Sequence, residues 1–403
     1  MSELNLSTFD LYNPTDEHRM LREQVAAFVK KEVEPQALEN DRNETFNIPL
    51  FKKLGEMGLL GITVDPDFGG SGMDAVAAVI AHEELSTSDP GFCLAYLAHA
   101  MLCANNFAVN STGDLKARVL PKLCSGEWIG AMGMSEPGVG TDVLGMSSTA
   151  VRDGDHYILN GRKMWITNGT IDDDGTPGDC CLVYAKTDTG EGRRPSLSTF
   201  LVEKGMDGFS VGQKIRDKNG MRASPTAELV FDNCKVPVAN RVGEEGDSML
   251  HMMRNLELER LTLAAMSLGI ARRSIEVMVN YANERQAFGQ KLSAFGQIQR
   301  HIGESYAEFV ACRAYVYNTA RHLDLESHGN RVDSDGVKLV ASTMAKNVAD
   351  RAMQVLGGYG YVGEYVVERL WRDAKLLEIG GGTNEAHQKN ITRDLSRNGL
   401  PWG

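Results

Sequence analysis

The sequence predicts an α+β protein in which a helical domain, a β domain and a second helical domain follow one another along the chain. Apolar residues recur at helical spacing through about the first 125 residues. Strand-like runs separated by glycine-rich turns replace that spacing near Trp128, and helical spacing returns from Gly246 almost to the end. We place the domains at residues 1–127, 128–240 and 241–403, and 403 residues are enough for three sizeable cores.

The N-terminal domain begins with a predicted helix capped by Thr15, with Asp16 and Glu17 in its first turn and Pro35 at its end. A second helix is expected from about Leu50 to Met57. Residues 65–72 read as a loop because of their Gly and Pro content, and the alanine-rich run 74–85 resumes the helix. Residues 92–106 are almost wholly apolar, which indicates a buried helix or a cavity wall, and His99 within them is typical of a satisfied core histidine.

In the β domain, Asn160-Gly161 lies between two β-rich runs and predicts a hairpin turn. Further strands are expected at 181–185, 198–202 and 228–231. The acidic, turn-rich segment 171–179 reads as an exposed loop. In the C-terminal domain, apolar-patterned stretches at about 247–285, 292–323 and 333–356 have the length of bundle helices.

Charge and cysteine content exclude several classes of function. The formal net charge of -12 argues against nucleic acid or an anionic membrane as the main partner. The seven cysteines form no zinc-binding spacing, so we expect reduced thiols and no metal site. The N-terminus shows no targeting pattern, and we find no apolar run of membrane-spanning length. These features predict a cytoplasmic protein.

The stretch 255–261 (Asn-Leu-Glu-Leu-Glu-Arg-Leu) places two carboxylates and a guanidinium within four residues. On a helix, Glu257 and Arg260 share a face, whereas Glu259 points elsewhere. One interpretation is a solvated, charged helix surface. The many leucines and methionines around the stretch favour the other, in which some of these charges are buried or line a cavity.

Two glycine clusters interrupt the regular patterns. Residues 135–142 (Ser-Glu-Pro-Gly-Val-Gly-Thr-Asp) combine hydroxyls and turn formers, which suits backbone amides around an anion or a flavin edge, although an ordinary turn fits equally well. Residues 379–383 (Ile-Gly-Gly-Gly-Thr) follow a helical run. They either end that helix or let the backbone approach a ligand closely.

Five motifs together resemble the acyl-CoA dehydrogenase family. They are Met134-Ser-Glu-Pro-Gly-Val-Gly-Thr-Asp142, Met164-Trp-Ile-Thr-Asn-Gly169, Arg285-Gln-Ala-Phe-Gly289, Gln354-Val-Leu-Gly-Gly-Tyr-Gly360 and Arg372-Asp-Ala-Lys375. The resemblance covers nearly the whole chain and is closest to the isovaleryl-CoA (branched-chain) subfamily. It implies the acyl-CoA dehydrogenase fold, with a middle β-barrel or sandwich and a C-terminal four-helix bundle. It also implies a homotetramer that binds one FAD per subunit.

The resemblance also implies the residues that hold FAD. It assigns the isoalloxazine and ribityl portion to one group in the β domain, the ADP half to residues that reach in from a neighbouring subunit, and the diphosphate or adenosine to residues 383–385. The glutamine usual eleven residues after Arg285 is Gly296 here, so that contact with the ADP half is either lost or supplied by Gln297. In this order the cofactor residues are Met132, Met134, Ser135, Gly140, Thr141, Trp165, Ile166 and Thr167; Arg285, Phe288, Gln297, Gln354, Gly357 and Gly358; and Thr383, Asn384 and Glu385.

For the reaction, the resemblance implies that Glu259 is the catalytic base. Most members of the family carry the base at the position of Gly381, and a glycine cannot take a proton. Isovaleryl-type members place it where this chain has Glu259. The Gly381 amide and a ribityl hydroxyl of FAD are expected to polarise the thioester carbonyl. The missing side chains of Gly380 and Gly381 leave room for a branched acyl chain, or else Leu97, Met101 or another bulky side chain refills that space. The substrate-binding residues implied are Tyr96, Leu97, Thr141, Glu257, Leu258, Arg260, Gly380, Gly381 and Gly382.

These features predict FAD-dependent α,β-dehydrogenation of a short or branched acyl-CoA to the 2-enoyl-CoA, with electron-transfer flavoprotein as the acceptor. Three alternatives remain open. The substrate is a longer branched acyl-CoA such as citronellyl-CoA or a cyclic one; the protein is a non-redox flavoprotein lyase or isomerase on the same scaffold; or it is a non-catalytic homologue. Retention of Glu259 counts against the last, and an oxidase is disfavoured by the chain length.

Overall fold

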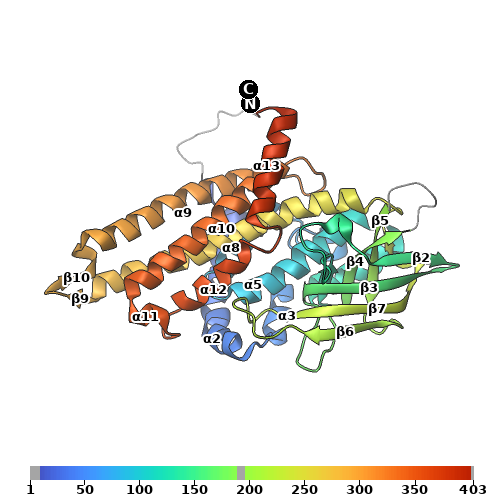
Figure 1. The fold of residues 1–403 in the computed structure, drawn as a ribbon, viewed down its shortest axis with the longest axis horizontal. Helices are drawn as coiled ribbons and strands as arrows, with labels where there is room; N and C mark the ends of the chain where they lie inside the picture. Colours follow the sequence, from blue (N-terminus) through green and yellow to red (C-terminus); the bar gives the residue numbers. More distant parts are fainter. Residues whose placement is uncertain (1–9, 188–195, 401–403) are drawn as a thin grey trace.

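A helix of 37 residues, α8 (Ser248–Glu284), is the longest element of the computed structural model, which describes residues 10–187 and 196–400. Figure 1 shows α8 running from beside the β domain to the opposite end of the molecule, where the short strands β9 (Gln286–Ala287) and β10 (Gln290–Lys291) form a ribbon. The first five residues, whose composition gave no targeting signal, lie outside the described part. The predicted order of helical, β and helical regions is confirmed.

The N-terminal region is helical, as predicted, and Thr15 caps its first helix by accepting a hydrogen bond from the His18 amide. The prediction that this helix ends at Pro35 is wrong. A π-helical turn (Val29–Val33) leads directly into the next helix, which has Pro35 in its first turn, where the missing N–H costs no hydrogen bond. The helices are α1 (Asp16–Phe28), α2 (Glu34–Asn43), α3 (Ile48–Glu56), α4 (Ala75–Leu85), α5 (Pro90–Leu97), α6 (Asn106–Asn110) and α7 (Gly113–Ser125).

The segment Pro90–Asn110, in which α5 and α6 are joined by the π-helical stretch Ala98–Asn105, is the apolar wall expected from the sequence. It corrects one expectation, because its length and composition would suffice to cross a membrane. Within the protein, 83% of its most apolar window is buried. His99 is a satisfied core histidine, since its Nε2 lies 3.0 Å from the Leu123 carbonyl and its Nδ1 accepts from the Gly130 amide at 3.0 Å.

The β domain is an eight-stranded sheet with the order β6-β7-β3-β2-β4-β5-β8, and β1 pairs with β4 beside this path. Its inward side chains form a separate apolar core. The last strand extends two residues past the domain boundary predicted at residue 240. The strands are β1 (Gly130–Gly133), β2 (Thr149–Asp153), β3 (His156–Thr167), β4 (Cys180–Thr187), β5 (Ser196–Glu203), β6 (Phe209–Lys214), β7 (Thr226–Pro237) and β8 (Arg241–Val242).

The hairpin turn predicted at Asn160-Gly161 is wrong. These residues lie inside the continuous strand β3, at a shift in its register with β7. A Cβ on Gly161 would lie 2.3 Å from Ser148 Oγ, so glycine is required there by close packing in a β-bulge rather than by a turn. The hairpin joins β2 to β3 instead, through Gly154 at a φ of 62°.

Residues 171–179 form a loop, as predicted, but the loop is not detached from the domain. Thr170 pairs with Pro177 across its base, and the Asp179 carboxylate accepts a hydrogen bond of 2.8 Å from the Ile129 amide. Near its tip, Asp173 forms ion pairs with Lys214 and with Arg216. Its acidic character therefore serves contacts within the β domain.

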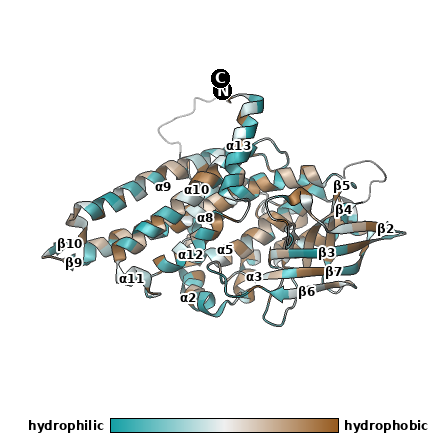
Figure 2. Ribbon diagram, in the orientation of Figure 1, coloured by the Kyte–Doolittle hydropathy of each residue, from teal (hydrophilic) through white to brown (hydrophobic). Residues whose placement is uncertain are grey.

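The C-terminal helices confirm the predicted bundle, in which α8, α9, α10 and α12 pack side by side. Figure 2 shows that α13 is largely hydrophilic, whereas α5 is largely hydrophobic. This contrast fits α13 lying at the surface and α5 in the core. The helices after α8 are α9 (Gly296–His322), α10 (Arg331–Leu356), α11 (Gly358–Tyr361), α12 (Val367–Leu377) and α13 (Asn384–Asn398).

Candidate active site

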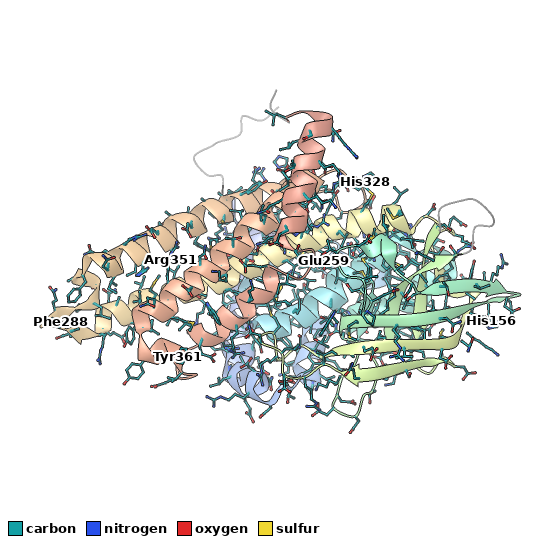
Figure 3. The ribbon with its side chains drawn as sticks, viewed as in Figure 1. His156, Glu259, Phe288, His328, Arg351 and Tyr361 are labelled. Carbon is teal, nitrogen blue, oxygen red and sulfur yellow. The ribbon has the colours of Figure 1, made fainter. Side chains whose placement is uncertain are left out.

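Glu259 lies at the centre of the molecule, on the buried face of α8 (Figure 3). Glu259 is only 8% exposed, so the acidic stretch does not form a solvated helix surface. Burial raises the pKa of Glu259 above its ordinary value, while the positive charges of Arg260 and Lys338 oppose that rise. A carboxylate in this setting is a stronger proton acceptor than one in water.

The glycine cluster after α12 meets α8 at this carboxylate. A Cβ added to Gly381 would lie 3.5 Å from Glu259 Oε1 and 2.2 Å from Leu263 Cδ1. Gly381 also has a φ of 66°, in the left-handed region that disfavours any side chain. The cluster therefore brings its backbone up to the acid, and its predicted close approach to a ligand stays a prediction. At Gly380 a Cβ would meet only ordinary contacts, 3.6 Å from the Leu376 carbonyl.

Charged side chains from α10 and α13 hold this glycine loop in place. Lys338 is fully buried, and its Nζ donates a hydrogen bond of 2.6 Å to the Gly382 carbonyl. The same carbonyl lies 3.0 Å from Nε2 of His387, whose Nδ1 is 2.6 Å from Asp335 Oδ1. Asp335 also pairs with Arg260, at 3.1 Å.

Two charged residues predicted to contact the CoA arm have clear partners within the protein. Arg260 is 8% exposed and forms the ion pair with Asp335. Glu257 is 3% exposed, and its carboxylate accepts hydrogen bonds from the amides of Gly329 and Asn330. Leu258 is buried in the main core between the two helical domains. Contact of these residues with a substrate stays a prediction, and in this structure they fix α8 to its neighbours.

The apolar stretch expected to wall the site packs directly against α8. Asn255, four residues before Glu259, donates a hydrogen bond of 2.9 Å from its side chain to the Met101 carbonyl. Leu97 and Met101 are both fully buried in the shared core. Tyr96 is fully buried as well, and its hydroxyl donates to the Leu59 carbonyl at 3.1 Å. A substrate role for Tyr96 and Leu97 stays a prediction, because the contacts found are core contacts.

A buried ion pair holds the first predicted flavin segment, which follows β1. Lys163 of β3 is fully buried and donates to Glu136 Oε1 at 2.9 Å and to the Met134 carbonyl at 3.2 Å. Although burial opposes ionisation, hydrogen bonds from Ser147, Ser148 and Lys163 lower the pKa of Glu136 to about 2. Both ends of the loop 134–148 are thereby tied to β3.

The residues of this loop and of β3 that are predicted to contact FAD differ in how exposed they are. Gly140 and Thr141 are exposed, Met132 and Ser135 are half-buried, and Met134 is buried. Trp165 is 63% exposed and has a φ of 65°, an unusual backbone conformation for an aromatic residue. Ile166 is buried and Thr167 half-buried, and the next residue, Asn168, ties β3 to the carbonyls of Ala95 and Gly130 at 2.9 and 3.1 Å.

The residues predicted for the ADP half come together at the far end of the bundle. Arg285 and Gly358, which are 73 positions apart in the chain, line one groove of about 440 Å³ with Tyr281 and Tyr359. Phe288 is 97% exposed at a φ of 51°. The other members of this group, Gln297, Gln354 and Gly357, are exposed too.

The predicted diphosphate or adenosine residues form the start of α13. Thr383 caps the helix by accepting a hydrogen bond of 3.2 Å from the Ala386 amide, and Glu385 is exposed in the first turn. The Asn384 side chain bonds to Ser342 and Thr343 of α10. These contacts fix the helix start to α10.

Within one chain, the two predicted halves of the flavin site lie apart. Figure 1 places β3, which carries Trp165, in the β domain at one end, and β9 and β10, which flank Phe288, at the other. Figure 3 labels Phe288 at that far tip, with Glu259 between the two ends. A single chain therefore does not bring the two halves together.

Five titratable residues organise this region without having been predicted to do so from the sequence: Asp335, Lys338, His387, Glu136 and Lys163. A signal for Lys338 was present, because Lys338, Ala341 and Ala345 follow the i, i+3, i+7 spacing of a buried helix face. A lysine on such a face requires a partner. The partner, a backbone carbonyl 44 positions away, was not predictable from the pattern.

The residues present fit a flavin. Side chains at Gly138, Gly140, Gly357 and Gly358 would meet no atom within 4 Å, so these glycines leave open space beside the backbone. Trp165 and Phe288 expose large aromatic surfaces in strained or left-handed conformations, which is unusual without a ligand or partner to cover them. Open backbone next to aromatic surface suits a large, flat, anionic cofactor.

Comparison with known proteins agrees with this geometry. The N-terminal, middle and C-terminal domain models of acyl-CoA dehydrogenase match residues 15–127, 131–234 and 249–396. Isovaleryl-CoA dehydrogenase of Pongo abelii is 43% identical over 94% of this chain and 88% of its own.

The chain also superposes on solved structures of acyl-CoA dehydrogenases. Butyryl-CoA dehydrogenase of Megasphaera elsdenii superposes with a TM-score of 0.89 at 35% identity, covering 95% of this chain and 99% of that chain. A glutaryl-CoA dehydrogenase of Mycobacterium smegmatis, solved with FADH2, superposes with a TM-score of 0.88 at 29% identity, covering 96% of both chains. The chain belongs to the acyl-CoA dehydrogenase family of FAD-dependent oxidoreductases.

Proposed function

We propose that this protein dehydrogenates a short or branched-chain acyl-CoA, such as isovaleryl-CoA, to the 2-enoyl-CoA, with Glu259 as the base. The observation that carries the proposal is the approach of Gly381 to the Glu259 carboxylate. Positions 259 and 381 are far apart in the chain but lie next to each other in the structure. Only position 259 carries an acid. A base on α8 thus reaches the place that a longer side chain on the glycine loop would also reach.

In this reaction the Glu259 carboxylate takes the α-proton, so a C–H bond breaks and an O–H bond forms. The electron pair of that C–H bond becomes the second bond between Cα and Cβ as the hydride leaves the β-carbon. FAD, when bound, supplies the acceptor for that hydride at its N5 atom. The buried setting of Glu259 keeps water away from the carboxylate and makes it the stronger base.

The Gly381 amide is proposed to polarise the thioester carbonyl. A backbone donor fixed in place stabilises the negative charge that develops on that oxygen as the α-proton leaves. The positive φ of Gly381 and the two contacts on the Gly382 carbonyl support a rigid orientation for this amide. Thr141, which is exposed on the flavin loop, together with Glu257 and Arg260, is proposed to border the CoA arm.

The preference for a branched acyl chain rests on the small residues beside the base. A Cβ added to Gly380 would meet only ordinary contacts, which supports space on that side. At Gly381, however, Leu263 occupies the position that a side chain would take. The branch is therefore proposed to lie next to Gly380 and against Leu263, rather than in the space left by Gly381.

An assembly of at least two subunits, which by family resemblance is a homotetramer, is proposed because each FAD needs both halves of its site. The short strands β9 and β10, which follow Arg285 and flank Phe288, lie at the opposite end of the molecule from β3, which carries Trp165 (Figure 1). One FAD contacts both groups only when a second subunit brings its far end to the β domain of the first. Electron-transfer flavoprotein remains the proposed acceptor and the cytoplasm the proposed location, the latter supported by seven free cysteines.

The test is anaerobic mixing of the purified yellow protein with acyl-CoA thioesters. Isovaleryl-CoA should bleach the flavin absorbance, and the product should be the 2-enoyl-CoA with the same carbon skeleton. Bleaching separates a dehydrogenase from a lyase or isomerase, which would return oxidised flavin and an altered thioester. Absence of bleaching with every branched, straight-chain and cyclic acyl-CoA tried would refute the proposal.

A further inference from the structure

Four titratable side chains from three helices lie buried together behind the glycine loop. Arg260 comes from α8, Asp335 and Lys338 from α10, and His387 from α13. All four are less than 10% exposed, and Asp335, Lys338 and His387 are fully buried. Burying this many ionisable groups is costly unless each has a partner, and it is unusual beyond functional sites.

The contacts of this cluster converge on one backbone atom, the Gly382 carbonyl oxygen. Lys338 Nζ donates to it at 2.6 Å, and His387 Nε2 lies 3.0 Å away. Asp335 holds the opposite side of the His387 ring at 2.6 Å. Gly381 and Gly382 both have positive φ values, 66° and 95°, and as glycines they supply no side chain to hold this part of the loop in shape. The cluster supplies that restraint.

The same lysine lies near the acid, because it binds the carbonyl of Gly382, and a Cβ on the adjacent Gly381 would lie 3.5 Å from Glu259 Oε1. The negative charge of Glu259 is the first of the charges that oppose the effect of burial on Lys338, whose pKa burial lowers to about 8. Conversely, Lys338 and Arg260 oppose the rise in the pKa of Glu259. Burial thus favours the neutral form of Lys338, and the negative charge of Glu259 favours its charged form.

Other charged or titratable groups also face this pair. Arg260 acts on Glu259 and on Lys338 from α8, while Asp335 and Glu378 attract Lys338 from α10 and from the end of α12. Burial, and in smaller part the negative charge of Glu259, raises the pKa of Tyr184 of β4. Burial lowers the pKa of His387, opposed by its hydrogen bond to Asp335, and Lys338 lowers it further. Of these groups, Lys338 alone is both hydrogen-bonded to the loop and coupled to Glu259.

We propose that Lys338 is a positioning residue of this site, which fixes the Gly381 amide by holding the Gly382 carbonyl and supplies the positive charge that stabilises ionised Glu259. The proposal rests on the proposed function of Glu259 as base. It assigns one side chain to two tasks that the reaction needs at once, since the base must be charged before proton transfer and the amide must be oriented during it. Lys338 itself does not touch the reacting atoms.

The first test measures hydrogen exchange of the holoenzyme over residues 376–386. K338M removes both the donor and the charge, K338R keeps both, and K346M removes a half-buried lysine two turns further along α10 as a matched control. Loss of a charge-assisted hydrogen bond should speed exchange in this segment by about ten-fold in K338M. K338R and K346M should exchange like the wild type. Should K338M not fold, K338Q, which keeps a polar side chain, replaces it.

The second test measures the rate of flavin reduction by acyl-CoA as a function of pH. Without the lysine charge, the pKa of Glu259 should rise, so the acidic limb of the profile should move upward by about one pH unit in K338M. K338R should restore the wild-type profile, and K346M should not change it. A merely structural role for Lys338 would lower the rate at every pH without moving this limb.

Each outcome decides a part of the proposal. Wild-type exchange over residues 376–386 in folded K338M would overturn the anchoring role, and an unmoved acidic limb would overturn the electrostatic role. A wild-type enzyme that no acyl-CoA reduces would instead refute the proposed function. The exchange experiment would then still decide whether Lys338 holds the loop.

Discussion

Gly381 and Glu259 lie against each other although 122 positions separate them in the chain, with 3.5 Å between the acid's Oε1 and the place where a Cβ of Gly381 would be. Leu263, one helical turn beyond Glu259, lies at 2.2 Å from the same place. The loop and α8 are thus fitted to each other through the absence of a side chain. This relationship supports the proposal that a carboxylate on α8 takes the role of the base, which by family resemblance usually stands on the loop.

The fit makes Gly381 intolerant of substitution. G381A places a methyl group against Leu263 at a positive φ, and we expect it to lower the free energy of unfolding by about 1–3 kcal/mol. Denaturant unfolding of the holoenzyme measures this effect. G380A is the matched control, because its Cβ meets only ordinary contacts, and it should change stability by less than about 1 kcal/mol. Equal stability of the two variants would show that the loop adapts easily.

Retention of FAD is expected to depend on the buried pair of Lys163 and Glu136. K163M leaves the Glu136 carboxylate buried without its cation, a change that typically costs about 3–5 kcal/mol when a buried pair is broken. We expect the loop 134–148 to loosen and the dissociation constant of FAD to rise at least about ten-fold. Fluorescence titration of the apoprotein with FAD measures it.

R162M provides the control for this experiment, because Arg162 is the neighbouring residue on β3 and its side chain is 62% exposed. It should bind FAD like the wild type. If K163M also bound FAD with the wild-type constant, the pair would not support the flavin loop.

Several of these features were predictable from the sequence, and the reason lies in how local they are. Helices such as α8 and α10 were found because their apolar periodicity extends over many residues. The hairpin turn predicted at Asn160-Gly161 was wrong because this pair of residues also occurs in β-bulges. The close packing of Ser148 against Gly161, which the local sequence does not show, favours the bulge. The helix end predicted at Pro35 was wrong because Pro35 lies in the first turn of α2, where a proline is compatible with the helix.

The candidate site was predictable only in part for a similar reason. Residue types and motifs indicated Glu259 and the flavin segments, but the partners of Lys338, His387 and Arg260 lie on other helices. The refilling of the space at Gly381 by Leu263 also depends on tertiary packing, and no sequence period encodes it. The residues proposed to carry chemistry were therefore easier to predict from the sequence than the residues that hold them in place.

Among acyl groups, a 3-methyl branch is expected to be preferred. One well-packed methyl group is worth roughly 1 kcal/mol, or several-fold in rate constant, so kcat/KM should be several-fold higher for isovaleryl-CoA than for butyryl-CoA or octanoyl-CoA under one electron acceptor. Longer branched chains such as citronellyl-CoA should come next. A higher value for either straight chain would contradict the preference. L263A should then show whether Leu263 sets it, by improving turnover of bulkier chains.

Dicarboxylic substrates should be poor. The stretch 92–101 that walls the site contains no Lys or Arg, and the nearby cations Arg260 and Lys338 already have partners in Asp335 and the Gly382 carbonyl. A second carboxylate on the acyl chain would therefore be buried without compensation. Steady-state rates with glutaryl-CoA should lie far below those with isovaleryl-CoA. Efficient turnover would mean that one of these two cations changes partner.

The central claim, that Glu259 is the base, is tested most directly by anaerobic stopped-flow reduction of the flavin in E259Q and E257Q. The two acids lie on the same helix and are both buried, but only Glu259 adjoins the glycine loop, whereas Glu257 binds the amides of Gly329 and Asn330. We expect E259Q to fold, to keep its FAD and to lose flavin reduction by several orders of magnitude, because an amide cannot accept the α-proton. E257Q should keep most of the rate. A rate in E259Q above about one tenth of the wild-type value would contradict the claim, and a larger loss in E257Q than in E259Q would transfer the role to Glu257.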